Sequence, residues 1–249
     1  MVNNMNNDLL NILNELRLDE SKSKLNSDGS IDYYDNINLS NMNLSHIPIK
    51  FKRVMGYFNI AFNPLTSLEN SPEYVSQDFL CSNTNIKSLI GMPKKIGGSL
   101  VCGSGPLESL EGCPDVIPLN FYCSDCNITS LLYGPKYVSG RYICVNNKLQ
   151  SLEGAPKFCN SDFQCSNNKL TSFEHCPSII SGIFDCSYNN IENIDYCPKK
   201  VGMSFIFVNK PKTITEKLIR SVCDIDWDVY FREGTFWWND GDNPIHPLP

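Results

Sequence analysis

Apolar and polar positions alternate in short stretches along most of this chain, and the stretches recur every 21 residues. Each stretch contains an aromatic or aliphatic residue, a variable residue and then a cysteine, as in Phe163-Gln164-Cys165. Such alternation is typical of a strand with one buried face. The cysteines form a column at Cys81, Cys102, Cys123, Cys144, Cys165 and Cys186. A fixed period of this size predicts a repeat architecture.

Three further columns keep the same register without insertions. The first consists of prolines. The second is a pair of apolar residues three positions apart that recurs in each repeat, such as Leu149 and Leu152, and the third is a mostly β-branched column from Val75 to Val201. The prolines occupy positions 72, 93, 114, 135, 156, 177 and 198. One repeat is too small to bury its own apolar face, but stacked repeats share a continuous core. We therefore expect a repeat solenoid of the α/β type, mainly β, with one curved parallel sheet on its concave side.

The columns also predict how the chain is divided. Eight full repeats over 35–202 and a partial ninth give an array over 35–209. Residues 1–34 are expected to form an N-terminal cap with a helix over 7–18 and a polar connector over 19–34. Residues 210–249 are expected to form a C-terminal cap and extended tail, with a helix over 213–223 that begins at a Thr213-x-x-Glu216 capping box. Aromatic residues there are expected to seal the last turn, with partner docking as the alternative: Trp227, Tyr230, Phe231, Phe236, Trp237 and Trp238.

The core of each repeat resembles a known family. The segment Phe163-x-Cys165-x-x-Asn168-x-Leu170 resembles the leucine-rich repeat consensus, with cysteine in place of the second leucine. Its short unit is similar to the repeats of bacterial effectors, bacteriophages and large DNA viruses, and the resemblance covers about two thirds of the chain. It implies a horseshoe-like fold and leaves function open. The sequence departs from the consensus at Thr84 and Gly105, which predicts a break in the ladder of asparagine side chains.

Cysteine allows three interpretations, namely disulfides, metal ligands and core residues. The repeat columns favour free core cysteines, because parallel Cβ vectors in neighbouring strands aim their sulfur atoms poorly at each other. Cys123-x-x-Cys126 has the spacing of a zinc or redox pair, but no second pair accompanies it. His46, His175 and His246 are far apart in sequence and support no nucleophilic site. We expect no catalytic residue, no cofactor and no metal, and hence a protein that is not an enzyme.

Net charge and hydropathy limit the classes of ligand that the protein is expected to bind. The net charge is -6 and the pI about 5.1, which disfavours nucleic acid and an anionic membrane surface as main ligands. The first residues lack the basic and apolar regions of a secretory signal, and no apolar run is long enough to span a bilayer. These features predict a cytoplasmic protein.

The remaining candidate for function is the concave surface, where solenoids commonly bind. Side chains between the buried strand positions are expected to point outward there, with an apolar stretch at its centre and polar neighbours. The predicted partner-binding residues are Tyr57, Leu80, Val101, Tyr122, Arg141, Ile143, Asp162 and Gln164. We expect a module that binds an unidentified protein, and the resemblance implies a viral or phage factor acting on host proteins in the host cytoplasm. The alternative is a structural or assembly component of a virion or larger complex, and the oligomeric state stays open.

Overall fold

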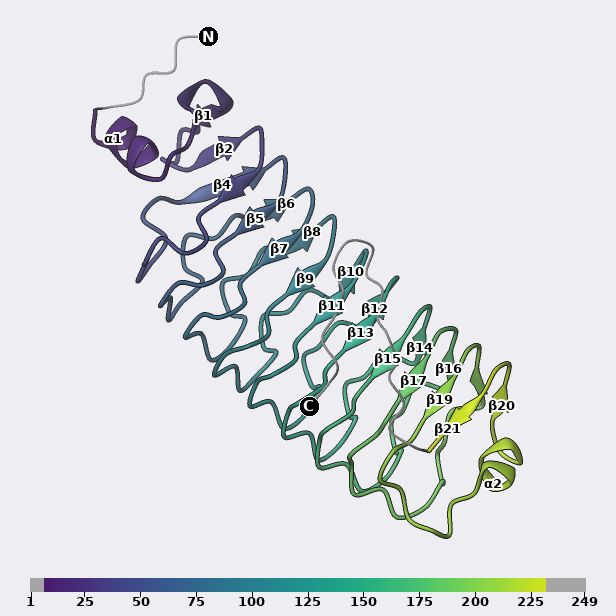
Figure 1. Cartoon of the computed structure of the whole chain (residues 1–249). Coiled ribbons are helices and arrows are strands. Elements are labelled where there is room, and N and C mark those ends of the chain that lie inside the picture. Colours follow the sequence, from purple (N-terminus) through teal and green to yellow (C-terminus); the bar gives the residue numbers. More distant parts are fainter. Residues whose placement is uncertain (1–6, 232–249) are drawn as a thin grey trace.

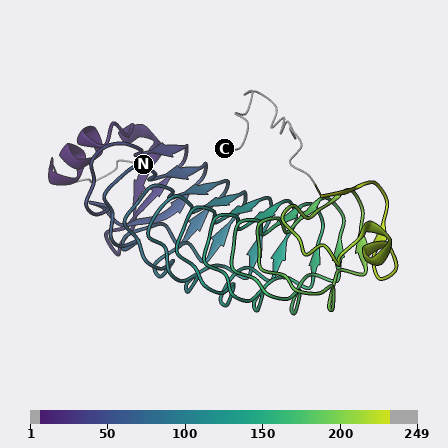
Figure 2. The ribbon, with the colours of Figure 1, turned by 60° about the horizontal axis from the view of Figure 1, so that its bottom comes forward.

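The structure is a computed structural model that describes residues 7–231. It is a mainly β, parallel solenoid, in which every turn contributes one short strand to a ten-stranded sheet (Figure 1). The array bends gently along its length (Figure 2). The ten strands are β3 (Ile37–Asn38), β5 (Phe58–Asn59), β7 (Phe79–Leu80), β9 (Leu100–Val101), β11 (Phe121–Tyr122), β13 (Tyr142–Ile143), β15 (Phe163–Gln164), β17 (Phe184–Asp185), β19 (Phe205–Ile206) and β21 (Val229–Tyr230). All neighbours in this sheet pair in parallel, as the repeat predicts.

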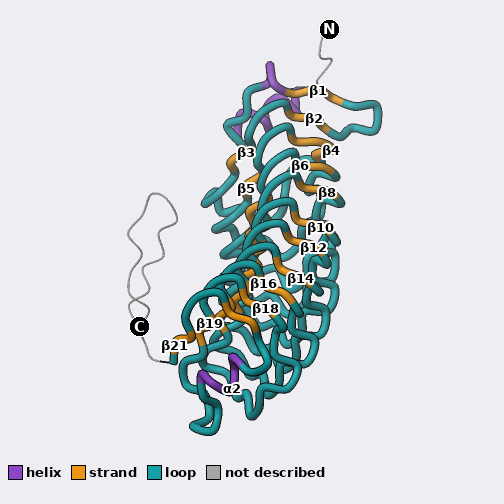
Figure 3. The backbone as a smooth tube through the Cα atoms, turned by 90° about the vertical axis from the view of Figure 1, so that its right-hand side faces the viewer, coloured by secondary structure: helices purple, strands orange, loops and turns teal. Residues whose placement is uncertain are grey.

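The expectation of one sheet is incomplete, because each turn carries a second strand. These second strands define the even-strand face, on the other side of the solenoid from the ten-stranded sheet (Figure 3). They fall into three pieces, a five-stranded sheet β1-β2-β4-β6-β8, the pair β10-β12 and a four-stranded sheet β14-β16-β18-β20. Their bounds are β1 (Ser23–Leu25), β2 (Ile31–Tyr33), β4 (Phe51–Val54), β6 (Tyr74–Val75), β8 (Lys95–Ile96), β10 (Val116–Ile117), β12 (Tyr137–Val138), β14 (Phe158–Cys159), β16 (Ile179–Ile180), β18 (Lys200–Val201) and β20 (Asp224–Ile225). The β-branched column from Val75 to Val201 supplies the inward residues of these strands.

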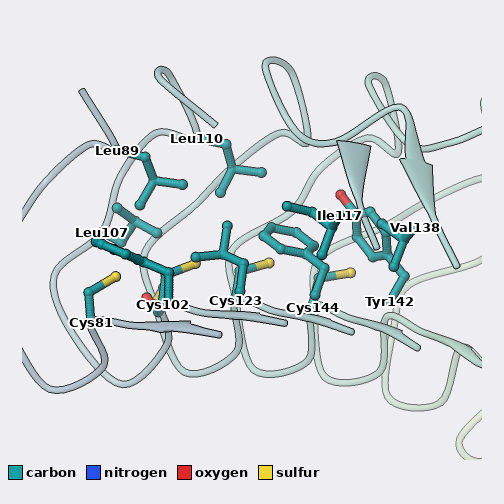
Figure 4. Close-up of a cluster of buried hydrophobic side chains, with 14 of the residues drawn as sticks. Cys81, Leu89, Cys102, Leu107, Leu110, Ile117, Cys123, Val138, Tyr142 and Cys144 are labelled. Carbon is teal, nitrogen blue, oxygen red and sulfur yellow. The ribbon is translucent and has the colours of Figure 1, made fainter. Parts of the chain in front are cut away.

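The core lies between the two sets of strands. Aromatic residues of the ten-stranded sheet contact each other from turn to turn, as in the edge-to-face pair of Phe121 and Tyr142 with ring centroids 4.9 Å apart. The cysteine column runs beside them, opposite aliphatic residues such as Leu110 and Ile117 (Figure 4). All twelve cysteines are free thiols. Burial raises the pKa of every thiol in the cysteine column, as expected for core residues that do not ionise.

Asparagine side chains satisfy the backbone where each turn leaves the ten-stranded sheet. The Nδ2 group of Asn168 donates to the carbonyls of Cys144, Cys165 and Ser166 at 3.0, 3.0 and 3.2 Å. Its Oδ1 accepts from the Leu149 amide at 3.0 Å. One buried amide therefore ties together two neighbouring turns.

This ladder of amides is broken where the sequence predicts the break. The hydroxyl of Thr84 reaches only a carbonyl of its own turn, that of Cys81 at 2.9 Å. Gly105 has no side chain to contribute. In the next turn the thiol of Cys126 takes the asparagine position and contacts the carbonyls of Ser124 at 3.3 Å and Cys102 at 3.8 Å.

A second period of 42 residues is superimposed on the first. In every other turn an Asn or Asp side chain precedes the strand of the ten-stranded sheet and accepts the backbone amide of the following turn, as Asn120 Oδ1 does from Arg141 at 2.9 Å. The other three pairs are Asn36 with Tyr57, Asp78 with Ser99, and Asp162 with Ile183. A Cβ on the glycine just before each accepted amide would overlap the carboxyl or amide oxygen; these glycines are Gly56, Gly98, Gly140 and Gly182. Gly98 and Gly140 have no positive φ, so these positions require glycine for space.

Both ends differ from the sequence expectation. At the N-terminal end, α1 (Asn7–Glu15) is shorter than predicted and η1 (Glu20–Lys22) follows it. The segment expected to be a connector forms the antiparallel hairpin β1–β2, and β2 pairs in parallel with β4. Leu13, Leu16 and Leu18 join the common core cluster.

At the C-terminal end, α2 (Glu216–Arg220) begins at Thr215, whose hydroxyl accepts from the Leu218 amide, and not at Thr213. β20 and β21 then form a further turn within the segment expected to be cap and tail. Phe231 is partly buried against the core, while Trp227 is exposed. The remaining aromatic residues of the predicted seal, Phe236, Trp237 and Trp238, lie outside the described residues, as does His246. Within residues 7–231, no helix has the length and apolar character needed to cross a membrane.

Candidate interaction surfaces

The predicted binding residues lie together along the ten-stranded sheet. Leu80, Val101, Tyr122, Ile143 and Gln164 follow one another at paired positions of β7, β9, β11, β13 and β15. Tyr57 and Arg141 precede strands β5 and β13 and are partly buried. The row therefore exists as one continuous line of side chains.

Three residues of that line are less exposed than the sequence analysis expects. Ile143 and Gln164 keep only 9% and 8% of their surface accessible, because parallel neighbours one strand apart cover each other. Asp162 is buried, and each of its carboxylate oxygens has a partner, one in the backbone and one in a side chain. Its Oδ1 accepts from the Ile183 amide, and its Oδ2 lies 3.2 Å from Nε of Arg141. The expectation that these three residues are exposed is wrong, whereas Leu80, Val101 and Tyr122 remain half-buried.

The even-strand face carries the more exposed apolar surface. Four consecutive turns present large apolar side chains at equivalent strand positions, and we name them the apolar row: Val116 (53% exposed), Tyr137 (49%), Phe158 (56%) and Ile179 (40%). The pairing of Val116 with Tyr137 and of Phe158 with Ile179 fixes their alignment. Apolar side chains gathered in one row and bordered by polar residues are typical of binding surfaces.

A groove of about 830 Å³ lies beside the centre of the apolar row. Exposed aromatic residues of the row, Tyr137 and Phe158, form part of its wall together with Tyr133. Its floor includes Gly134 and Ala155, the two smallest residues in the column that precedes the repeated proline. The groove coincides with the interruption between β12 and β14, across which Asn160 Nδ2 donates to the Tyr137 hydroxyl at 3.2 Å.

Lysines border the apolar row. The residues at and just before the same strand positions in six successive turns include six lysines and one aspartate, in a protein whose net charge is -6. Lys136 pairs with that aspartate, Asp115, at 2.8 Å, and Lys200 lies 3.5 Å from Asp226. Across residues 7–231 the other four have no ion-pair partner: Lys94, Lys95, Lys157 and Lys199.

The sequence contained a signal for this face. The residues of the apolar row come one position before the β-branched column and are themselves apolar in four turns in a row. Apolar residues at two adjacent positions give no period-2 alternation, so the pattern does not identify a strand with one exposed face. The close position of the lysines and the groove follows only from the stacking of turns.

Titratable side chains are scattered over the described part of the surface. Among the described residues no group of three or more His, Cys, Asp or Glu side chains is arranged to hold a metal ion. His46 and His175 are exposed and lie in different turns. On the ten-stranded sheet, desolvation raises the pKa of Asp185, although hydrogen bonds from Ser187 and Ser166 act in the opposite direction.

No family model, no curated protein and no solved structure matches this chain.

Proposed function

We propose that this chain is a non-enzymatic protein-interaction module that grips a partner protein on one long face of its solenoid. The observation that carries this proposal is the apolar row, with Tyr137 and Phe158 exposed at its centre. Aromatic residues surrounded by polar ones are typical of the energetic centre of protein interfaces. The stacked turns hold the row rigidly, so little order has to be acquired on binding.

The finer identity of the fold belongs to the same proposal. The motif Phe163-x-Cys165-x-x-Asn168-x-Leu170 and the hydrogen bonds of its asparagine support a leucine-rich repeat array. The similarity of the short unit to viral, phage and effector repeats supports a factor that acts on host proteins. Cytoplasmic action agrees with twelve free thiols, because that compartment keeps thiols reduced.

Two surfaces compete as the contact site. The apolar row has the larger exposed apolar area, whereas the line on the ten-stranded sheet offers half-buried Leu80, Val101 and Tyr122. We place the site on the even-strand face, because a side chain must be accessible before it can contribute apolar area to an interface.

Site-specific crosslinking tests the proposal. A photo-crosslinking amino acid replaces Phe158, Tyr122 or Phe62 in three variants of the full chain, each exposed to an extract of the native host. We expect one protein adduct from position 158 and none from position 62, an exposed residue that belongs neither to the apolar row nor to the line on the ten-stranded sheet. Adducts only from position 122 would move the site to the ten-stranded sheet. Adducts from none of the positions, or only with further copies of this chain, would contradict the proposal and favour an assembly component.

A further inference from the structure

The charge around the apolar row limits what can cover it. Lys95 and Lys200 end the row, and Lys157 beside Phe158 lines the groove without an ion-pair partner in residues 7–231. On the other flank the row is bordered by uncharged residues, Pro118, Ser139, Asn160 and Ser181. The face is thus apolar along its centre and positive along one edge.

A second copy of this chain does not fit this face. A twofold axis can pack the apolar rows of two copies against each other in two ways. The two rows run either in opposite directions or in the same direction. In the first, Lys95 faces Lys200 of the other copy, and in the second each lysine faces itself. Both arrangements place like charges at the ends of the contact, where their repulsion opposes association, most strongly at Lys95, because Asp224 and Asp226 partly neutralise Lys200.

The spacing of the row matches a helix. Neighbouring strands are ~4.8 Å apart, so the four residues of the row extend over roughly 15 Å. Side chains on one stripe of an α-helix recur every ~5.4 Å, and about ten residues cover the same length. Same-side residues of an extended strand recur at ~6.7 Å and would fall out of step with the row.

From these features we propose that the even-strand face binds an amphipathic helix of the partner protein, with its apolar stripe along the apolar row and an edge of Asp and Glu facing the lysines. This inference rests on the proposed function and names its partner. The groove over Gly134 and Ala155 has the volume to receive one large side chain of that stripe. Helix-in-groove recognition of this kind reads apolar anchors at i, i+3, i+4 and i+7.

Single-stranded nucleic acid is the competing ligand, because aromatic residues beside lysines can also stack bases. Two observations disfavour it. Val116 and Ile179 are aliphatic and offer no stacking surface. Glu111 and Glu153 are exposed and come directly before Gly112 and Gly154, which line the groove. A phosphodiester backbone carries charge at every nucleotide and cannot avoid them, whereas a helix can confine its carboxylates to one edge.

A pair of designed peptides tests the inference with the full chain. Both are helices of about 15 residues with the same leucine and tryptophan stripe, flanked on one edge by glutamate in the first and by lysine in the second. We expect the glutamate peptide to bind roughly tenfold more tightly than the lysine peptide at low salt, because several exposed charge pairs each contribute modestly. This preference should shrink as salt is added, because salt screens exposed charges. Fluorescence anisotropy of labelled peptides measures both affinities, and a labelled oligothymidylate is titrated in parallel.

Matched variants locate the binding site. Phe158→Ala and Lys157→Glu change exposed residues of the site and should each weaken glutamate-peptide binding severalfold. Phe62→Ala and Lys169→Glu make the same changes at exposed positions elsewhere and should leave it unaltered. Equal affinity for the two peptides, binding of neither, preference for the oligothymidylate, or self-association abolished by Phe158→Ala would overturn the inference. A host protein crosslinked through position 158 would still support the proposed function in each of the first two cases.

Discussion

At the scale of single residues, this solenoid is held together by side chains that replace water at backbone amides. Asn120 accepts the amide of Arg141 in the next turn and fills the space that a side chain at residue 140 would need. Glycine therefore alternates with larger residues in one column, namely Asp35, Gln77, Leu119, Ser161 and Met203. The 42-residue period is a consequence of this exchange of volume between neighbouring turns.

Gly140→Ala should destabilise the protein by ~1–3 kcal/mol, because the added methyl group overlaps Asn120 Oδ1 and the Leu119 backbone in a close-packed interior. Urea denaturation followed by circular dichroism measures the change in the free energy of unfolding. Ser161→Ala, in the same column one turn later, is the control and should change stability by less than ~0.5 kcal/mol. A neutral Gly140→Ala would show that the 42-residue period has another cause.

At the scale of elements, β13 carries an exception to the aromatic column. Tyr142 occupies a position where β11 and β15 have phenylalanine, and its hydroxyl is buried without a hydrogen-bond partner in the described structure. Burial raises the pKa of this phenol well above its usual value. Figure 4 shows the hydroxyl extending toward Ile117 and Val138, across the core from the cysteine column. The space for it comes from Gly134, at which a Cβ would lie 3.0 Å from the hydroxyl oxygen.

Tyr142→Phe should stabilise the fold by ~1 kcal/mol, because it removes a buried polar group that makes no hydrogen bond. Thermal and urea unfolding measure the change. Gly134→Ala should destabilise the wild type and cost less in the Tyr142→Phe background, since only part of its overlap, that with the Leu131 carbonyl, remains. A loss of stability in Tyr142→Phe would reveal an unrecognised partner for the hydroxyl.

At the scale of the whole molecule, a parallel array exposes strand edges at both ends. The hairpin β1–β2 covers the N-terminal end of the even-strand face and is fixed there by Asp32, which is fully buried. Its Oδ2 accepts from Arg53 Nη2 at 2.7 Å, and its Oδ1 from Asn26 at 3.2 Å. Desolvation tends to raise the pKa of this carboxyl, but the hydrogen bonds from Arg53 and Asn26 lower it below its usual value.

Asp32→Asn should destabilise the protein by ~1–2 kcal/mol at neutral pH. The expected loss is smaller than for a fully buried ion pair, because the Arg53 side chain is exposed and solvent screens its charge. Because the pKa of Asp32 is lowered in the folded protein, the ionised carboxyl contributes fully to stability above its pKa in the unfolded chain. That contribution is lost as the pH falls through its pKa in the folded protein. The difference between wild type and variant should therefore begin to shrink below pH ~4 and vanish once the pH is below the folded pKa. Chemical denaturation across this pH range measures it, with the exposed Asp195→Asn as control. A difference that persists in acid would attribute the effect to packing.

The sequence predicted the parallel strands of the ten-stranded sheet, the buried cysteine column and the break in the asparagine ladder. Each of these depends on contacts between equivalent residues of successive repeats, which a 21-residue period displays directly. The candidate site was predicted less well. Ile143 and Gln164 alternate with buried residues as exposed ones should, yet neighbouring strands cover them. The apolar row of the even-strand face escaped notice because two adjacent apolar positions have no strand period.

By itself, the sequence determined the stacking of turns, because only a shared core buries the Phe, Cys and Leu columns together. It also determined where the amides of the ladder are missing, since Thr84 and Gly105 lack that group. Only the tertiary structure decided which outward residues are accessible, how the hairpin β1–β2 and the turn β20–β21 extend the two ends, and where lysines and aromatic residues meet. The physical reason is that exposure and charge at a surface depend on how residues of several turns are placed side by side, and one repeat read alone does not contain that placement.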